Sequence, residues 1–154
     1  MTVLLENEQP EPVDEASLSA LAESVLSEEG YPPSTIVEVT LVTDDRIASL
    51  NGEHLDRDGP TDVLAFPLEN LEPGAVPAAD PGGPPIALGD VIVAPAFVRR
   101  QAEDAGVGFP DEMSLMVVHG ILHLMGYDHT DDDDAEMMEE RERMILSRMG
   151  TEQR

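Results

Sequence analysis

The chain of 154 residues has the length of one average domain, and its 41% hydrophobic and 27% charged residues are typical of a globular rather than a disordered protein. It contains no Cys, which excludes disulfide bonds, thiolate metal ligands and a cysteine nucleophile. The net charge of −25 comes from 33 acidic residues against 8 basic ones, all Arg, and it opposes binding to a polyanion unless the arginines cluster or salt screens the repulsion.

This acidity has two explanations that the sequence leaves open. The acidic bias suits a salt-rich cytoplasm, whereas the absence of Lys, taken by itself, is also consistent with GC-rich coding.

The first part of the chain predicts alternating strands and helices. Apolar residues recur at helical spacing in two segments, Asp14–Ser27 and Asp44–Leu55. Gly30 supplies a stop after the first, and the second begins with a residue suited to cap a helix. Short apolar or β-branched runs predict three strands, at Val3–Leu5, Thr35–Thr43 and Val63–Phe66.

A surface loop is expected over residues 67–85, which hold six of the thirteen prolines. The strand after it, Ile86–Ala94, contains Gly89, where we expect a bulge or the close approach of another backbone. Three further helices are expected, at Pro95–Gly106, Pro110–Met125 and Asp131–Met149. Because strands and helices do not alternate regularly, the sequence predicts an α+β fold: one domain over residues 1–154, with a small mixed sheet and about five helices.

The apolar stretches are too short to cross a membrane. The longest, Leu115–Met125, has 11 residues, against about 20 for a transmembrane helix. The N-terminal residues turn acidic at Glu6, before the apolar region of a signal peptide develops. We therefore expect a cytoplasmic protein with no membrane partner.

Three of the four histidines lie within 11 residues of one another. His119 and His123 are one turn apart on the apolar helix, and Gly126 ends that helix so that the chain can return with His129. The spacing H-x-x-x-H-x-x-G-x-x-H is that of a zinc site with three protein ligands and an open fourth position, which marks a catalytic site. A lone core histidine would be read as structural, but the clustering favours a metal. His54, on another helix, is expected to be solvated.

Zinc peptidases with this spacing carry a glutamate base directly after the first histidine. Here that position is Gly120, which cannot abstract a proton, so peptide hydrolysis is disfavoured. Two other features have open alternatives. Asp128 is either an acceptor for a ligand imidazole or a solvated turn residue. The pair Thr61-Asp62 either contacts substrate or metal-bound water, or forms a turn and cap before a strand.

The motif H-G-x-L-H-L-x-G-Y-D-H, preceded by P-T-D-V-L-x-F-P at 60–67 and by Gly-Asp at 89–90, resembles the YbeY endoribonuclease family. The resemblance covers nearly the whole chain. It implies an α+β fold, one Zn²⁺ held by His119, His123 and His129, and cleavage of single-stranded RNA. It also implies a role in 16S rRNA 3′-end maturation and ribosome quality control, with the small ribosomal subunit or its proteins as partners.

The sequence departs from the family pattern at two positions. The family's usual Arg, five residues before P-T-D, is Leu55 here, and Arg57 is the nearest replacement and the candidate catalytic residue. The usual Ser before the Phe is Ala65. A second hypothesis is therefore a zinc-stabilised ribosome-assembly factor with little or no nuclease activity. The sequence leaves the nucleophile open between metal hydroxide and the RNA 2′-hydroxyl.

Overall fold

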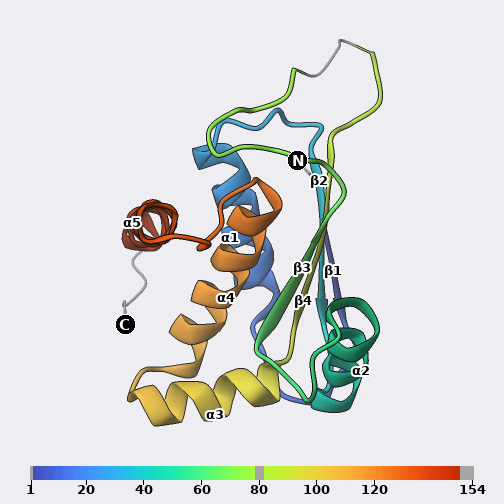
Figure 1. The fold of residues 1–154 in the computed structure, drawn as a ribbon, viewed down its shortest axis with the longest axis vertical. Helices are drawn as coiled ribbons and strands as arrows, with labels where there is room; N and C mark the ends of the chain where they lie inside the picture. Colours follow the sequence, from blue (N-terminus) through green and yellow to red (C-terminus); the bar gives the residue numbers. More distant parts are fainter. Residues whose placement is uncertain (1, 79–81, 150–154) are drawn as a thin grey trace.

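A four-stranded sheet organises the fold, with helices on both of its faces (Figure 1). The structure is a computed structural model that describes residues 2–78 and 82–149. The strands are β1 (Thr2–Asn7), β2 (Ile36–Leu41), β3 (Val63–Pro67) and β4 (Ala87–Val93). The helices are α1 (Glu15–Glu28), α2 (Asp44–Leu55), α3 (Pro95–Ala105), α4 (Phe109–Leu124) and α5 (Asp132–Arg148).

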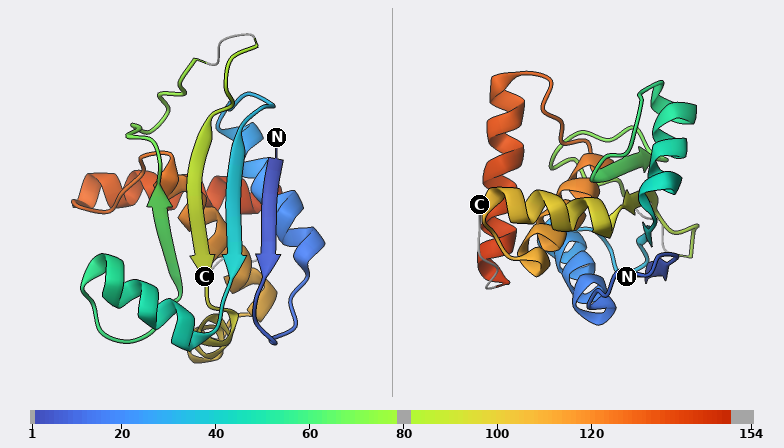
Figure 2. Two further views of the ribbon diagram at one scale, coloured as in Figure 1. Left: turned by 90° about the vertical axis from the view of Figure 1, so that its right-hand side faces the viewer. Right: turned by 90° about the horizontal axis from the view of Figure 1, so that it is seen from below.

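The sheet is mixed, as predicted, and its strand order is β1-β2-β4-β3. Strand β2 lies parallel to both β1 and β4, whereas β3 runs antiparallel to β4 at the edge of the sheet. Parallel neighbours need a long crossover, which α1 supplies between β1 and β2. The left view of Figure 2 shows the four strands side by side, with α2 in front of the lower end of β3.

Alternation along the strands gives the sheet two apolar faces of unequal size. On β3, Val63 and Ala65 pack into the main core together with α1, α4 and α5, whereas Leu64 and Phe66 belong to a smaller cluster with Ile47 of α2. Helix α4 therefore covers the inner face of the sheet. Helix α5 lies beyond α4 and packs on α4 and α1 (Figure 2, right).

The bulge expected near Gly89 is present. Between the pairs Ile36–Ala87 and Glu38–Asp90, two steps along β2 correspond to three along β4. Gly89 has φ +133°, and a Cβ there would overlap the carbonyl oxygen of Phe66. The position therefore requires Gly both for its dihedral angle and for the approach of β3.

The predicted helices and strands agree with the structure to within a few residues at each end. The described part of residues 67–85 contains no helix or strand after Pro67, as expected of a loop, and Leu71 and Val76 from it pack against the core. Residues 79–81 of that loop, like residues 1 and 150–154, lie outside the described residues. Within the described ranges, no helix combines the length and the apolar character that crossing a bilayer requires.

Candidate functional site

Helix α4, which carries the first two histidines, is packed between the sheet and α5, and this packing fixes its orientation. Its side chains Val117, Val118, Ile121 and Leu122 are all fully buried. Burial on more than one face matches the near-continuous apolar sequence of this helix. The polar positions between these residues therefore have well-defined directions.

Gly126 ends the helix turn and redirects the chain toward the third histidine. Its φ is +101°, and a Cβ would overlap the carbonyl of Leu71 in the loop after β3. Backbone hydrogen bonds from Gly126 and Tyr127 to the carbonyls of His123 and Leu122 close the end of the helix. The glycine predicted from the motif is thus required by both backbone conformation and packing.

The three predicted histidines come together at this end of α4. The ring centroids of His119 and His129 lie 5.8 Å apart, with an angle of 38° between the planes. His123 lies close enough to both for their charges to lower its pKa. By contrast, His54 is exposed on α2 and contacts Phe66 edge-on at 5.2 Å between centroids, away from this group.

The pKa values of the two helical histidines are shifted in opposite directions. For His123, burial lowers the pKa below its usual value, partly opposed by the charge of Asp128. For His119, burial also favours the neutral ring, but the hydrogen bond and charge of Glu142, aided by the charge of Asp62, outweigh burial and raise the pKa. His123 is thus the more readily available as a neutral ligand.

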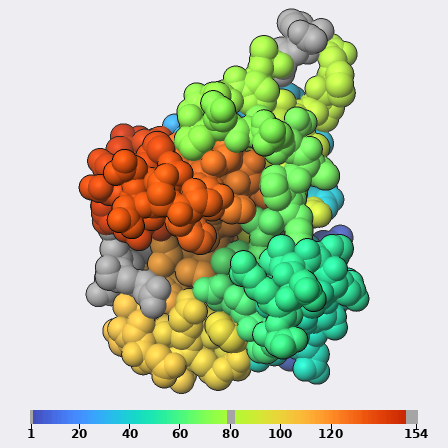
Figure 3. All heavy atoms as spheres, in the orientation of Figure 1, coloured from blue at the N-terminus to red at the C-terminus, as the bar shows by residue number. Residues whose placement is uncertain are grey.

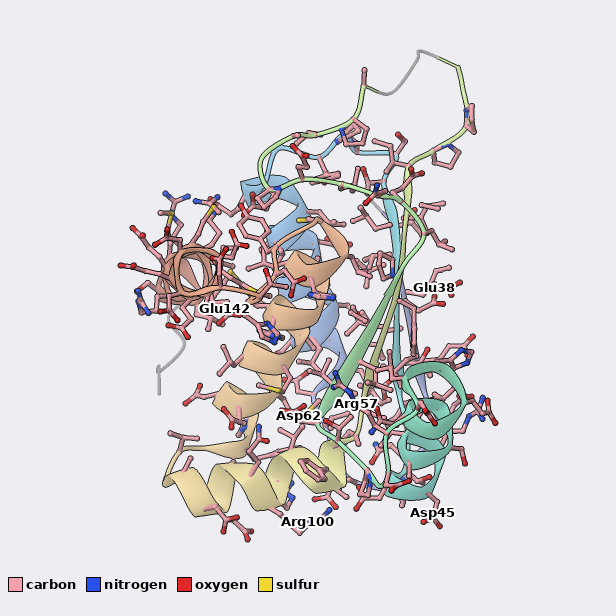
Figure 4. All side chains as sticks on the ribbon, in the orientation of Figure 1. Glu38, Asp45, Arg57, Asp62, Arg100 and Glu142 are labelled. Carbon is pink, nitrogen blue, oxygen red and sulfur yellow. The ribbon has the colours of Figure 1, made fainter. Side chains whose placement is uncertain are left out.

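Glu142 is a site residue that the sequence analysis did not single out. One carboxylate oxygen lies 2.5 Å from Nδ1 of His119, although the residues are 23 positions apart. Glu142, labelled on α5 in Figure 4, is 7% exposed. It shares the buried stripe of α5 with Met138 and Ile145. The signal in the sequence was a charged residue at an otherwise apolar i, i+4, i+7 position.

The side chains of Asp128 and Asp62 each accept a hydrogen bond from the backbone N–H of the next residue. Asp128 accepts the backbone N–H of His129 at 2.8 Å and lies 3.9 Å from the Nδ1 atom of that ring, too far for a hydrogen bond. Asp62 accepts the backbone N–H of Val63 at 2.7 Å, which supports the turn-capping interpretation. Its charge nevertheless acts on His119.

The donor set suits a zinc ion, although its atoms do not converge on one point. Within residues 2–78 and 82–149, no group of three or more His, Asp or Glu side chains is arranged to hold a metal. Three imidazoles on a fixed helix end are nevertheless the donors that zinc prefers. The carboxylate on Nδ1 of His119 leaves Nε2 as the free ring nitrogen, which is the arrangement found behind metal-bound histidines. The chemistry of the donor set therefore suits zinc, whereas the arrangement of the described side chains does not form a metal site.

Gly120 faces the sheet and has no room for a side chain. A Cβ there would lie 2.5 Å from Cγ1 of Val91 and 3.3 Å from Cγ2 of Val63. The position that carries the general base in zinc peptidases is thus filled by the contact between α4 and the sheet. This packing gives a physical reason, beyond the missing carboxylate, to disfavour peptide hydrolysis.

The surface is hollowed over α4, between α5 and the segment that runs from α2 into β3 (Figure 3). In Figure 4, which has the same orientation, Arg57 and Asp62 are labelled on the segment that leads from α2 into β3. Arg57 is exposed and forms no ion pair with any residue that the structure describes. Its guanidinium is therefore available to an anionic ligand.

Leu55, at the position where the resemblance implied an Arg, is the last residue of α2 and is 42% exposed. The next residue, Asp56, has φ 52° and reverses the chain toward Arg57. Ala65 lies at the middle of β3 and packs against the main core, in the part of the sheet that faces α4.

An ion-pair network fixes α5 and the loop that carries His129. Glu29, at the end of α1, accepts hydrogen bonds from Arg141 Nε at 2.6 Å and from the Tyr127 hydroxyl at 3.1 Å. Burial and the negative charge of Glu29 raise the pKa of Tyr127 to about 12. Through Glu29, the network therefore connects Arg141, which precedes Glu142, to Tyr127, which lies in the loop before His129.

Comparison with known proteins gives consistent matches. The family model described as Endoribonuclease YbeY matches residues 4–150. The chain is 43% identical over 134 residues to Endoribonuclease YbeY of Acidothermus cellulolyticus, covering 86% of this chain and 82% of that protein. It is 38% identical over 146 residues to Endoribonuclease YbeY of Beutenbergia cavernae, covering 95% of each.

A solved structure supports the same relationship. The solution structure of a Thermotoga maritima protein superposes with a TM-score of 0.58 at 28% sequence identity, and the match covers 96% of this chain and 91% of that one. Sequence and structure therefore agree over nearly the full length, and the chain belongs to the endoribonuclease YbeY family.

Proposed function

We propose that this protein is a zinc-dependent endoribonuclease that cleaves single-stranded RNA and acts in 16S rRNA 3′-end maturation and ribosome quality control. The observation that carries the proposal is the group of three imidazoles at one end of α4, with a buried carboxylate behind one of them. Membership of a family whose relatives are named endoribonucleases supports the reaction class. Precursor rRNA, and through it the small ribosomal subunit or its proteins, are the proposed partners.

Each residue of the site has a role that follows from its position. His119, His123 and His129 are the proposed ligands, one Zn²⁺ per chain, and the bound ion supplies a Lewis acid for a phosphodiester. Arg57 binds a phosphate of the RNA across the hollow, since its guanidinium presents forked donors that match phosphate oxygens. Gly120 supplies no base, so proton transfer does not depend on that position.

A second candidate function is a ribosome-assembly factor whose zinc is structural. One observation favours it: four arginines are already paired with acidic residues, namely Arg99, Arg100, Arg141 and Arg148. The resemblance adds to this, since it implies an Arg where this chain has Leu55. Both reduce the positive charge available to RNA, and the net charge is −25. Such a protein would bind zinc normally yet cleave RNA slowly or not at all.

The test compares the wild-type protein with His129→Ala and with the matched control His54→Ala, which removes an exposed imidazole outside the site. Zinc content is measured by elemental analysis. Cleavage is measured on an unstructured RNA oligonucleotide and on an RNA that contains the 16S 3′ precursor sequence.

The nuclease proposal expects about one zinc per chain and cleavage for wild type and His54→Ala, with loss of both in His129→Ala. Zinc retention without cleavage in the wild-type protein would favour the assembly factor. Equal zinc content in all three proteins would refute the three-histidine site.

A further inference from the structure

Glu142 occupies a position where a charged residue is costly. Helix α5 has seven acidic residues, and Glu142 is the one buried among them. Moving a carboxylate out of water costs several kcal/mol unless it gains a compensating partner. An apolar residue would extend the stripe of Met138 and Ile145 at no such cost. The partner of Glu142 therefore accounts for its presence.

That partner is His119, and the contact selects one tautomer of its ring. An ionised carboxylate can only accept a hydrogen bond, so the short contact at 2.5 Å requires a proton on Nδ1. In the neutral ring, the lone pair then resides on Nε2. The contact also holds the ring plane, because Glu142 is fixed to a packed helix rather than to a loop.

We propose that Glu142 is a positioning residue that holds His119 in the Nδ1–H tautomer with Nε2 free to bind zinc. The inference rests on the proposed function in naming zinc as the ligand. It assigns a role to α5, which contributes none of the three histidines. Carboxylates in this role also raise the basicity of the ligand and strengthen metal binding.

The position of α5 is independently secured, as positioning requires. Arg141, the preceding residue, bonds to Glu29 through Nε at 2.6 Å and to the backbone oxygen of Glu28 through a terminal nitrogen at 3.2 Å. Arg148, near the other end of the helix, pairs with the side chain of Glu28. Helix α5 is therefore attached to the end of α1 at two points, and Glu142 lies between them.

The alternative role for Glu142 is a stabilising ion pair with a protonated His119. Both roles predict a less stable protein when Glu142 is replaced, so stability does not distinguish them. A stabilising role predicts no change in zinc affinity of the folded variant. A positioning role predicts weaker zinc binding and a ring whose tautomer is no longer fixed.

The experiment measures zinc affinity by competition with a chromophoric chelator for wild type, Glu142→Gln and Glu140→Gln. Glu140 lies exposed on the same helix, so its variant makes the same change of charge outside the contact. We expect Glu142→Gln to bind zinc about 10–100-fold more weakly and Glu140→Gln to match wild type. Equal affinity in all three proteins would overturn the inference while leaving the three-histidine site intact.

A second measurement uses the unmodified protein and so does not depend on the folding of a variant. Nitrogen-15 NMR of metal-free wild type at about pH 9, well above the ordinary histidine pKa of ~6.5, reports which ring nitrogen of His119 carries the proton. A proton on Nδ1 supports the inference, and a proton on Nε2 overturns it. If wild type binds no zinc, the proposed function fails and the zinc role of Glu142 fails with it.

Discussion

Gly120 permits a quantitative test of how α4 packs against the sheet. Replacing it with Ala places a methyl group 2.5 Å from Cγ1 of Val91 and 3.1 Å from Cγ2 of the same residue, which is fully buried. Val91 is β-branched and sits within β4, so it has few ways to move aside. Gly52 on α2 provides the matched control, because a methyl group there meets only the Arg57 oxygen at an ordinary 3.7 Å.

The two substitutions share one energetic term and differ in the other. Replacing Gly by Ala inside a helix stabilises a protein by up to about 1 kcal/mol through backbone entropy. Inserting a methyl group into a packed core costs about 1–3 kcal/mol. We therefore expect Gly52→Ala to gain stability, and Gly120→Ala to be about 1–3 kcal/mol less stable than Gly52→Ala.

Urea unfolding followed by circular dichroism measures the difference in unfolding free energy, with thermal melts as a second measurement. At about 2–4 °C per kcal/mol for a chain of this size, the melting temperatures should differ by roughly 2–12 °C. Equal stabilities, or a more stable Gly120→Ala, would show that α4 is not packed against Val91 as described.

The same geometry governs an attempt to restore the peptidase glutamate. Gly120→Glu would press a carboxylate against Val91 and Val63, so we expect an unfolded or strongly destabilised protein without peptidase activity. A folded Gly120→Glu variant that hydrolyses peptides would contradict both the packing and the functional conclusion drawn from it.

Three further predictions concern RNA and pH. Leu55→Arg should raise RNA affinity or cleavage, because it adds forked phosphate donors at an exposed position where the resemblance implied an Arg. Unchanged values in a folded, zinc-loaded variant would place Leu55 away from the substrate. As salt rises from about 0.05 to 1 M, RNA affinity should first rise, because salt screens the repulsion between the −25 charge and the RNA. It should then fall, because counterion release from the RNA becomes less favourable in concentrated salt. A steady decline would refute this. Folding raises the pKa of Tyr127 from about 10 to about 12, so its contribution to stability is present below pH 10 and is lost as pH rises toward 12. Between pH 10 and 12, the unfolding free energy of Tyr127→Phe should therefore depend less on pH than that of wild type.

The parts of the site that follow from local sequence were predictable. The i, i+4 spacing of His119 and His123 on an apolar run places both rings on one helix face whatever the tertiary structure. A glycine before His129 signals a left-handed residue at the end of a helix, and Gly126 adopts φ +101°. Likewise, Gly89 in a β-branched run indicated the bulge that the register confirms.

The parts that depend on tertiary pairing were not predictable. Glu142 meets His119 only because α5 folds back across α4. Its place between Met138 and Ile145 marked it as a charge in an apolar stripe, but the sequence did not show which residue that stripe would face. The ion pairs of Arg99 with Glu11 and Arg100 with Asp44 join residues 88 and 56 positions apart. The strand order β1-β2-β4-β3 likewise follows from long-range packing, and the sequence predicted only that the sheet is mixed.

The charge distribution explains why a metal would matter for RNA binding as well as for cleavage. Arg99, Arg100, Arg141 and Arg148 are committed to acidic partners, and each such pair offers a phosphate less attraction than a free guanidinium does. Arg57 forms no ion pair with any residue that the structure describes. A divalent ion held by the three imidazoles would then be the largest positive charge near the substrate. RNA affinity in this chain should therefore depend on zinc loading more strongly than in its Leu55→Arg variant.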